Sequence, residues 1–258
     1  MKIINRELPN YFNELKLLIM ADTHIGDGLF NEKKLKQMIK EIKEEDNTYV
    51  IINGDLLNNG VKHSKTDIYS EQHTPGESIE ILEDLLEPIK DKILVMLDGN
   101  HENRTYRESG LSIMKQVART IGKPELYADP AFLLYLSFGK NRGRDNRKTV
   151  YAIYGKHGNG GASKKYTKMK YVTEMSNTVP DADVFVHSHT HLPGAIRDAI
   201  DKVDYRNRVV RRHERIFVNS SAFLKFGGYG ERKNYPPSTN IYPHIYLDGK
   251  KRLARALI

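Results

Sequence analysis

Five short runs rich in Ile, Val, Leu and Tyr constrain the fold of this chain more than any other feature. They cover residues 15–21, 49–53, 93–97, 150–154 and 184–186. Runs of this length and composition are typical of strands buried within a sheet. Amphipathic helical patterns separate the first three runs and follow the third, so the first half of the chain is predicted to have the order βαβαβα.

The helical patterns carry start and stop signals. In residues 31–46 the apolar positions recur at spacings of three and four, which forms one apolar stripe against a sheet. Thr74, followed by a proline and then by Glu77, predicts a capping box at the start of a second helix. A third helix is predicted over 111–121, with Gly122 as its C-terminal stop.

The second half of the chain is predicted to be richer in strands. Residues 132–138 and 149–154 flank a charged connection and predict a hairpin. Further strands are predicted at 203–210, 215–219 and 241–247. Because no internal repeat or long linker divides the chain, we expect one domain over residues 1–258, a mixed α/β sandwich rather than a purely doubly wound sheet.

Composition excludes several classes of site. The 258 residues include no cysteine, which rules out disulfides, thiolate metal sites, iron–sulfur clusters and a cysteine nucleophile. The longest apolar run, 131–136, is far shorter than the ~18 residues that span a bilayer, so no membrane partner is expected. Residues 1–16 contain Asn, Arg, Glu and Pro and lack a secretory apolar core, so we expect a cytoplasmic location.

Polar clusters follow each of the five apolar runs. They are Asp22 with His24, Asp55 after Gly54, Asn100 with His101 and Glu102, His157 alone, and His189 with His191. In open α/β sheets the carboxyl ends of strands are where ligand sites assemble. The five clusters can therefore contribute to one site.

The chemistry of these clusters suits a divalent metal centre. Carboxylates, imidazoles and an amide oxygen form a mixed ligand set for Mn²⁺, Fe²⁺ or Zn²⁺. The candidate ligands number seven: Asp22, His24, Asp55, Asn100, His157, His189 and His191. One ion needs fewer, so two ions ~3.5–4 Å apart are expected, bridged by a carboxylate. Asp55, in a turn preceded by glycine, is the predicted bridge. In an extended segment, residues two apart point to the same side, so Asp-x-His and His-x-His would each present two ligands to the same cavity.

The order of these motifs, from Asp22 to His191, resembles that of the calcineurin-like metallophosphoesterase superfamily, which includes nucleases, phosphodiesterases and protein phosphatases. The resemblance implies a four-layer αββα sandwich with mixed sheets, a dimetal centre and phosphoester hydrolysis. It assigns Asp22, His24 and His191 to one ion, Asn100, His157 and His189 to the other, and Asp55 to both. It also makes His101 the catalytic histidine beside the scissile phosphate rather than a ligand.

Two positions depart from the family pattern. Asn58 stands where the second motif usually has Asp, and Ser188 stands where the last motif usually begins with Gly. Neither removes a predicted ligand. Residues around ligands commonly tune metal affinity or activity by about 10–100-fold, so these changes are expected to affect metal affinity or the basicity of His101.

Cationic residues near the motifs are predicted to bind substrate phosphates. Arg104 and Arg107 follow His101, and Lys164 and Lys165 follow the Gly-rich loop after His157. A solvated helix face is the alternative reading. The segment 223–237 mixes aromatic residues with cations, which suits single-stranded nucleic acid, but a Gly-rich loop packed at the core edge fits equally well.

The sequence thus predicts a dimetal phosphoester hydrolase, in which a hydroxide shared by the ions attacks phosphorus and His101 protonates the departing oxygen. Mn²⁺ is the expected metal, with Fe²⁺, Zn²⁺ or Ni²⁺ as alternatives. The formal net charge of +8 favours a phosphodiesterase acting on nucleic acid or nucleotides. The alternatives are a phosphomonoesterase of the protein-phosphatase kind and a non-catalytic binding module. No protein partner is indicated.

Overall fold

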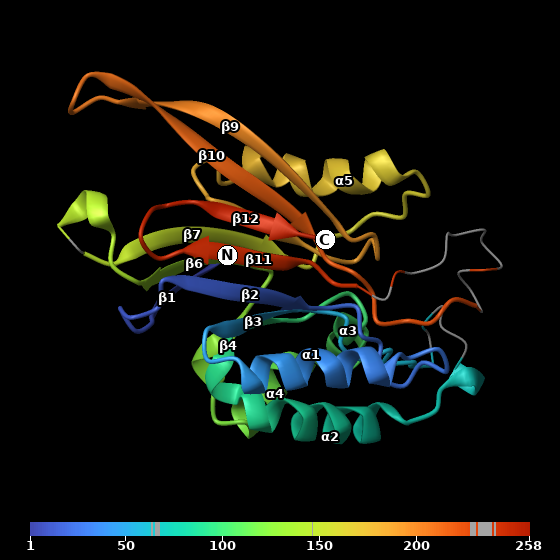
Figure 1. Ribbon diagram of the computed structural model, residues 1–258. Coiled ribbons are helices and arrows are strands. Elements are labelled where there is room, and N and C mark those ends of the chain that lie inside the picture. The colour runs from blue at the N-terminus through green and yellow to red at the C-terminus, as the bar shows by residue number, and fades with distance from the viewer. Residues whose placement is uncertain (63, 65–67, 146, 228–230, 232–238, 240) are drawn as a thin grey trace.

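The computed structural model describes residues 1–62, 64, 68–145, 147–227, 231, 239 and 241–258. In this part of the chain two six-stranded sheets stack face to face, and helices cover their outer faces (Figure 1). The strands are β1 Lys2–Glu7, β2 Glu14–Met20, β3 Thr48–Asn53, β4 Ile93–Leu97, β5 Tyr127–Ala128, β6 Ala131–Phe138, β7 Thr149–Lys156, β8 Val184–His187, β9 Gly194–Asp204, β10 Val209–Asn219, β11 His244–Asp248 and β12 Ala254–Leu257. The α-helices are α1 Glu32–Glu44, α2 Pro75–Leu86, α3 Glu102–Ser109, α4 Ile113–Thr120 and α5 Lys165–Thr173.

Both sheets are mixed. Sheet 1 has the order β1-β6-β7-β8-β10-β9, and sheet 2 has the order β12-β11-β2-β3-β4-β5. In sheet 2 the strands from β2 to β5 are parallel, as the predicted βαβ order requires, whereas β11 and β12 add antiparallel pairs. In sheet 1 the predicted β6–β7 hairpin is antiparallel, and β7, β8 and β10 are parallel.

Successive residues of the central strands alternate between two hydrophobic layers. In β2, Leu17 and Ile19 face the core between the sheets, and Leu18 and Met20 face the core under the helices. In β8, Val184 faces the core between the sheets and its neighbour Phe185 faces α5. Strands covered on both faces have no polar side to present to water, which explains why they read as continuous apolar runs in the sequence.

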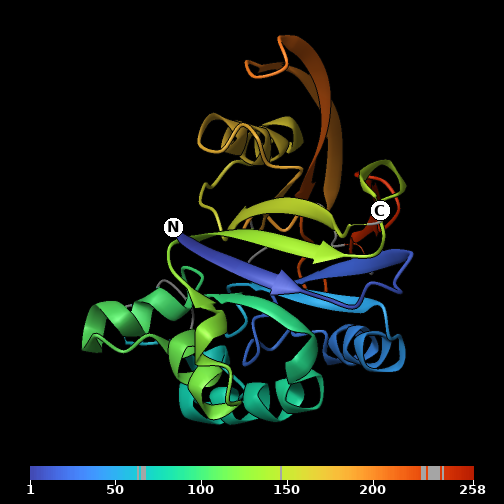
Figure 2. The same ribbon diagram turned by 90° about the vertical axis from the view of Figure 1, so that its left-hand side faces the viewer.

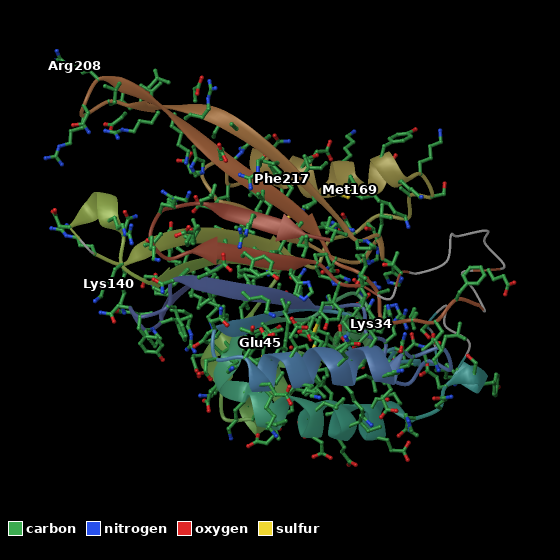
Figure 3. The ribbon with its side chains drawn as sticks, in the orientation of Figure 1. Lys34, Glu45, Lys140, Met169, Arg208 and Phe217 are labelled. Atoms are coloured by element: carbon green, nitrogen blue, oxygen red, sulfur yellow. The ribbon has the colours of Figure 1, made fainter. Side chains whose placement is uncertain are left out.

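The outer layers complete the sandwich. Helices α1, α2 and α4 contribute to the core on one side, and α5 packs on sheet 1 on the other (Figure 2). Met169 of α5 packs against the cluster that contains Phe217 of β10 (Figure 3). The expected four-layer αββα sandwich is confirmed.

Several start and stop signals are also confirmed. Thr74 and Glu77 form both hydrogen bonds of a capping box at the start of α2. Asn31, for which no capping role was predicted, accepts a hydrogen bond from the backbone N–H of Lys34 at the start of α1. Gly122, just after α4, has a φ of 73°, which glycine adopts without the strain that a Cβ would bring.

The prediction of one strand over residues 203–210 is wrong. These residues form the far end of the β9–β10 hairpin, where Val203 pairs with Val210 across the two strands. The tip carries Arg208, which lies at the end of a long projection (Figure 3). The two short apolar groups on either side of the turn resembled one run, because no proline or glycine marks the reversal.

Among the described residues no helix is both long enough and apolar enough to cross a membrane.

Candidate metal centre

The loops that carry the five polar clusters come from both sheets and meet at one place. Three of them follow β2, β3 and β4 of sheet 2, and two follow β7 and β8 of sheet 1. The backbone N–H of His189 lies 3.1 Å from each carboxylate oxygen of Asp22, and His157 Nε2 lies 3.1 Å from Asp55 Oδ2. The site therefore lies at the edge where the two sheets adjoin.

Asp22, His24 and His191 form the first donor group, with ligand atoms all within 4.8 Å of one another. The Nε2 atoms of His24 and His191 are 3.2 Å apart, and His191 Nε2 lies 3.5 Å from Asp22 Oδ1. Asp22 and His24 are buried. Two facing imidazole nitrogens at this distance need a proton or a cation between them or beside them.

Asp55, His157 and His189 form the second donor group, again with ligand atoms within 4.8 Å. The amide oxygen of Asn100 lies 3.2 Å from His157 Nε2 and so adjoins this group. Asp55 also belongs to a third set of nearby atoms with His24 and His101. Asp55 is thus close to both donor groups, as its predicted bridging role requires.

The backbone at these residues differs from the extended geometry that the sequence suggested. Asp22, His24, Asp55, His189 and His191 all have φ between 50° and 67°. This left-handed conformation is costly for residues with a Cβ and is found mainly where the surrounding structure imposes it, often at functional sites. The two residues of Asp-x-His and of His-x-His therefore reach one cavity through tight turns rather than through a pleated strand.

Glu102 anchors the loops around Asp55. Its buried carboxylate accepts hydrogen bonds from the backbone N–H groups of Asp55, Leu57 and Gly99 at 2.9, 3.0 and 2.7 Å. Burial and the neighbouring Asp55 carboxylate raise the pKa of Glu102 to about 7, although the backbone donors act in the opposite direction. The sequence marks Glu102 only as part of the third motif, and its anchoring role becomes visible only in the structure.

Gly99 is required by the same close packing. A Cβ at this position would lie 2.1 Å from Asp55 Oδ1 and 2.3 Å from its backbone nitrogen. Contacts this short cannot be relieved without moving the predicted bridging ligand. The glycine of the Gly-Asn-His-Glu motif is therefore a spatial requirement of the candidate centre.

Two anchors of the first donor group were not predicted. Ser220, directly after β10, places its Oγ 3.1 Å from Asp22 Oδ2. Lys168 of α5 donates to the backbone carbonyl oxygen of Thr190, between the two histidines of the last motif, at 2.8 Å. A serine after an apolar strand and a lysine on a helix are too common for their sequence context to indicate these contacts.

The departure at Ser188 has a structural role. The Ser188 hydroxyl lies 2.7 Å from the side-chain nitrogen of Asn53, which also donates to the carbonyl oxygen of Lys156 at 3.0 Å. These bonds join the ends of β3 and β7 beneath the site. The hydroxyl therefore connects the two sheets next to the candidate ligands.

The charges around the centre favour the ligand forms of His24 and Asp55 but not of His157. Burial opposes protonation of His157, yet the Asp55 and Asp22 carboxylates raise the pKa of its ring to about 10. Burial and the nearby imidazoles of His101 and His191 keep the pKa of His24 well below its ordinary value, so its ring is neutral. Burial opposes ionisation of Asp55, but the imidazoles of His157 and His101 hold the pKa of this carboxyl well below its usual range. Neutral imidazoles and ionised carboxylates are the forms that bind metal ions, so an ion bound by His157 would displace the proton of this ring.

These residues fit a pair of divalent ions on independent grounds. The buried Nδ1 atom of His189 has no hydrogen-bond partner among the described residues. Buried polar atoms in proteins almost always have a hydrogen-bond partner. An unpaired, buried ring nitrogen among other potential ligands is therefore what we expect of a residue that binds a metal ion. The donor set of carboxylates, imidazoles and an amide suits Mn²⁺, Fe²⁺ or Zn²⁺.

His101 lies at the rim of the centre. Its Nε2 is 3.9 Å from Asp55 Oδ2, and its ring centroid is 4.5 Å from that of His24. Asn58, at the position where the family pattern has Asp, accepts from His101 Nδ1 through its backbone carbonyl at 2.7 Å. The side chain of Asn58 instead donates to Glu71 at 2.7 Å, so the ring of His101 is held by a neutral acceptor.

The predicted substrate-binding cations occupy different surroundings. Arg104 is part-buried and contacts His101, whereas Arg107 is exposed in the last turn of α3. Lys164 and Lys165 are exposed at the start of α5, where Lys164 Nζ lies 5.7 Å from the ring centroid of Tyr166. Much of the aromatic and cationic segment 223–237 lies outside the described residues.

The sequence profile of the calcineurin-like phosphoesterase family matches residues 15–206, which include every predicted ligand. The chain belongs to this family. The calcineurin-like phosphoesterases are dimetal-dependent, and membership indicates an enzyme that hydrolyses phosphate esters. A comparison with curated protein sequences finds no match.

Two solved structures resemble this calcineurin-like phosphoesterase at a distance. A conserved uncharacterized protein from Streptococcus pneumoniae TIGR4, described as a predicted phosphoesterase, shares 12% identity with a TM-score of 0.38, covering 95% of this chain and 97% of the other. A hypothetical protein from Pyrococcus horikoshii OT3 shares 12% identity with a TM-score of 0.41, covering 94% and 87%.

Proposed function

We propose that this protein is a phosphodiesterase that acts on nucleic acid or nucleotides with two divalent metal ions. The observation that carries the proposal is the convergence of the two donor groups and His101 at the edge between the sheets. Family membership supports phosphate-ester hydrolysis, and the substrate class is inferred from charge. Mn²⁺ is the expected metal.

Each side chain has a defined task in this proposal. Asp22, His24 and His191 would hold one ion, and Asn100, His157 and His189 the other, with Asp55 between them. When bound, the two ions neutralise phosphate charge and lower the pKa of water toward neutrality, which supplies a nucleophile. Glu102 and Ser220 keep the carboxylates in position, because their hydrogen bonds restrict the loops of Asp55 and Asp22.

His101 is proposed to act on the departing oxygen. Its Nδ1 donates to a backbone carbonyl oxygen, so the proton that passes to the ester is one that Nε2 takes up from solvent in place of its contact with Arg104. Transfer of that proton to the oxygen as its bond to phosphorus breaks prevents accumulation of an alkoxide. A positioned general acid of this kind typically contributes ~10²–10⁴-fold to the rate.

The preference for diesters of nucleic acid or nucleotides rests on the lysines predicted to bind phosphate and on the charge of the whole chain. Lys164 and Lys165 lie at the start of α5, on the segment that follows His157. The whole chain carries a formal net charge of +8. Cations beside a metal centre hold the further phosphates of an extended polyanion, which a small monoester lacks.

A comparison of three substrate classes tests the proposal. Purified protein loaded with Mn²⁺ is assayed with a bis-aryl phosphate, a mono-aryl phosphate, and single- and double-stranded DNA. We expect turnover of the diester and of DNA to exceed that of the monoester. A preference for the monoester would replace the proposal by a phosphatase. Absence of turnover with Mn²⁺, Fe²⁺, Zn²⁺ and Ni²⁺ would leave a binding module.

A further inference from the structure

The turn after β3 and the first turn of α3 are interlocked beside the candidate metal centre. Asn59 Nδ2 donates to the carbonyl oxygen of His101 at 2.6 Å and to Thr105 Oγ1 at 3.0 Å. Arg104 Nη1 donates to the carbonyl oxygens of Asn58 and Asn59 at 2.9 and 3.3 Å. The two segments therefore behave as one unit, and His101 is part of it.

Both ring nitrogens of His101 are engaged within this unit. Nδ1 lies 2.7 Å from the carbonyl oxygen of Asn58, which can only accept, so Nδ1 carries the proton. Arg104 Nη2 lies 2.9 Å from Nε2, and a guanidinium can only donate, so Nε2 is the acceptor. Two neighbours thus specify the same tautomer and the same ring orientation.

The geometry of the guanidinium makes this arrangement specific to arginine. The carbonyl oxygen of Asn58 accepts from both His101 Nδ1 and Arg104 Nη1. Because the guanidinium is planar and rigid, fixing Nη1 on that oxygen also fixes where Nη2 meets the ring. A lysine has one nitrogen on a flexible chain and cannot hold the turn and the ring at once.

We propose that Arg104 is a positioning residue that orients His101 toward the ester, and that it does not bind the substrate phosphate. The inference rests on the proposed function, in which His101 acts on the departing oxygen. Arg104 keeps Nε2 on the side of Asp55, from which it is 3.9 Å distant. The bonds from Nη1 to the two carbonyl oxygens keep the guanidinium beside the ring. The proton that Nε2 gives to the departing oxygen comes from solvent and displaces only the Nη2 contact.

A double-mutant cycle distinguishes positioning from phosphate binding. Arg104→Ala, His101→Ala and the double variant are assayed on two diesters, one with a nitrophenolate leaving group and one with an alkoxide leaving group. We expect Arg104→Ala to lower kcat by about 10²-fold with the alkoxide ester, because a small misplacement of an acid has this effect, and to leave KM nearly unchanged. The loss should be smaller with nitrophenolate, which needs less protonation.

In the His101→Ala background the Arg104 substitution should cause no further loss. A rise in KM of equal size in both backgrounds would overturn the proposal and return Arg104 to phosphate binding. Arg104→Lys retains the charge, so full recovery of kcat by this variant would also overturn it. Thr105→Val is the matched control, because it removes another bond of the interlock without touching His101, and it should leave the dependence on leaving group unchanged.

A measurement without substrate separates this inference from the proposed function. Side-chain ¹⁵N NMR of the metal-free protein reports which ring nitrogen of His101 carries the proton. We expect the Nδ1–H tautomer alone in the wild type and in Thr105→Val, and a mixture of tautomers in Arg104→Ala. An unchanged tautomer in Arg104→Ala would contradict the positioning role. A protein that hydrolyses no ester but shows this shift would refute only the proposed function.

Discussion

Asp55 connects the two donor groups of the candidate centre. Its carboxylate lies 3.1 Å from His157 Nε2 and accepts from the backbone N–H of His101 at 2.8 Å. It is buried, and the carboxylate of Glu102 holds its backbone. This buried carboxylate is expected to serve both ions, since it lies near His157 and His189 of one donor group and near His24 of the other.

Removal of the Asp55 carboxylate should therefore weaken binding of both ions. We expect Asp55→Ala to fall from about two metal ions per chain to fewer than about one, because two-metal sites rely on a bridging group. Metal analysis of the purified variant after Mn²⁺ loading and dialysis checks this. Asp201→Ala, on the exposed β9–β10 hairpin, is the control. Retention of two ions in Asp55→Ala would show that the bridge lies elsewhere.

His101 should separate turnover from metal content. We expect His101→Ala to retain its metal ions while kcat falls by roughly 10²–10⁴-fold, the typical contribution of a general acid. Metal analysis of the purified variant gives the number of ions per chain, and steady-state kinetics on the same preparation gives kcat. If metal content and turnover fell in parallel, His101 would be a ligand instead.

At the scale of elements, a cluster of hydrogen bonds attaches α1 to sheet 2. The Glu41 carboxylate of α1 accepts from Lys16 of β2 at 2.7 Å, from the Tyr242 hydroxyl at 2.7 Å, and from His244 Nε2 of β11 at 2.9 Å. Burial disfavours the charged carboxylate, but these donors outweigh it and lower the pKa of Glu41 to about 2. The cluster therefore joins one helix to two strands through a single anion.

The stabilisation by Glu41 should depend on pH. A carboxyl whose pKa is lower in the folded state stabilises the protein above its unfolded pKa, and the stabilisation disappears as pH falls through the folded pKa. Because folding lowers the pKa of Glu41 from 4.5 to about 2, its stabilisation of the fold is lost as the pH falls from 4.5 to about 2. We expect Glu41→Gln to reduce the free energy of unfolding by about 1–2 kcal/mol at pH 7, after allowance for solvent screening.

Urea unfolding of the wild type and Glu41→Gln at pH 7 and pH 3 measures this effect. The difference between the two proteins should narrow at pH 3, where the unfolded-state carboxyl is already protonated. Glu44→Gln, an exposed position on the same helix, is the control. An equal difference at both pH values would contradict the assignment of the stabilisation to the ionised Glu41.

At the scale of the whole molecule, charge is the property that bears on substrate choice. The chain carries 41 Lys and Arg residues against 33 Asp and Glu residues. Many of the charges on the β9–β10 hairpin are paired, as in Arg212 with Asp201 and Arg197 with Glu214. The exposed lysines at the start of α5 lie instead on the segment that follows His157.

Salt should therefore weaken the use of DNA more than the use of a small diester. Binding of a polyanion releases counterions, so its affinity falls steeply as salt rises. Between 50 and 200 mM salt we expect KM for DNA to rise by about tenfold or more, and KM for a bis-aryl phosphate to change by less than about twofold. The two substrates are assayed in one series of buffers. Equal salt dependence would argue against a nucleic-acid substrate.

The strands and the candidate ligands at their ends could be predicted from sequence because both depend on local signals. The runs at β2, β3 and β4 are apolar on both faces, and the capping box at Thr74 satisfies backbone groups within one turn. The Asp and His motifs follow strands by a few residues. The left-handed backbone at five of these residues was not predictable, because contacts distant in sequence impose it.

The sequence by itself determined which residue types can bind metal and on which strand ends they stand, because composition and short-range pattern specify both. Only the tertiary structure decided that sheet 1 and sheet 2 bring their strand ends to one edge, and that Arg104 faces His101 rather than open solvent. The physical reason is that packing between the sheets joins residues far apart in the chain, such as Asp22 and His189, and no local pattern encodes that distance.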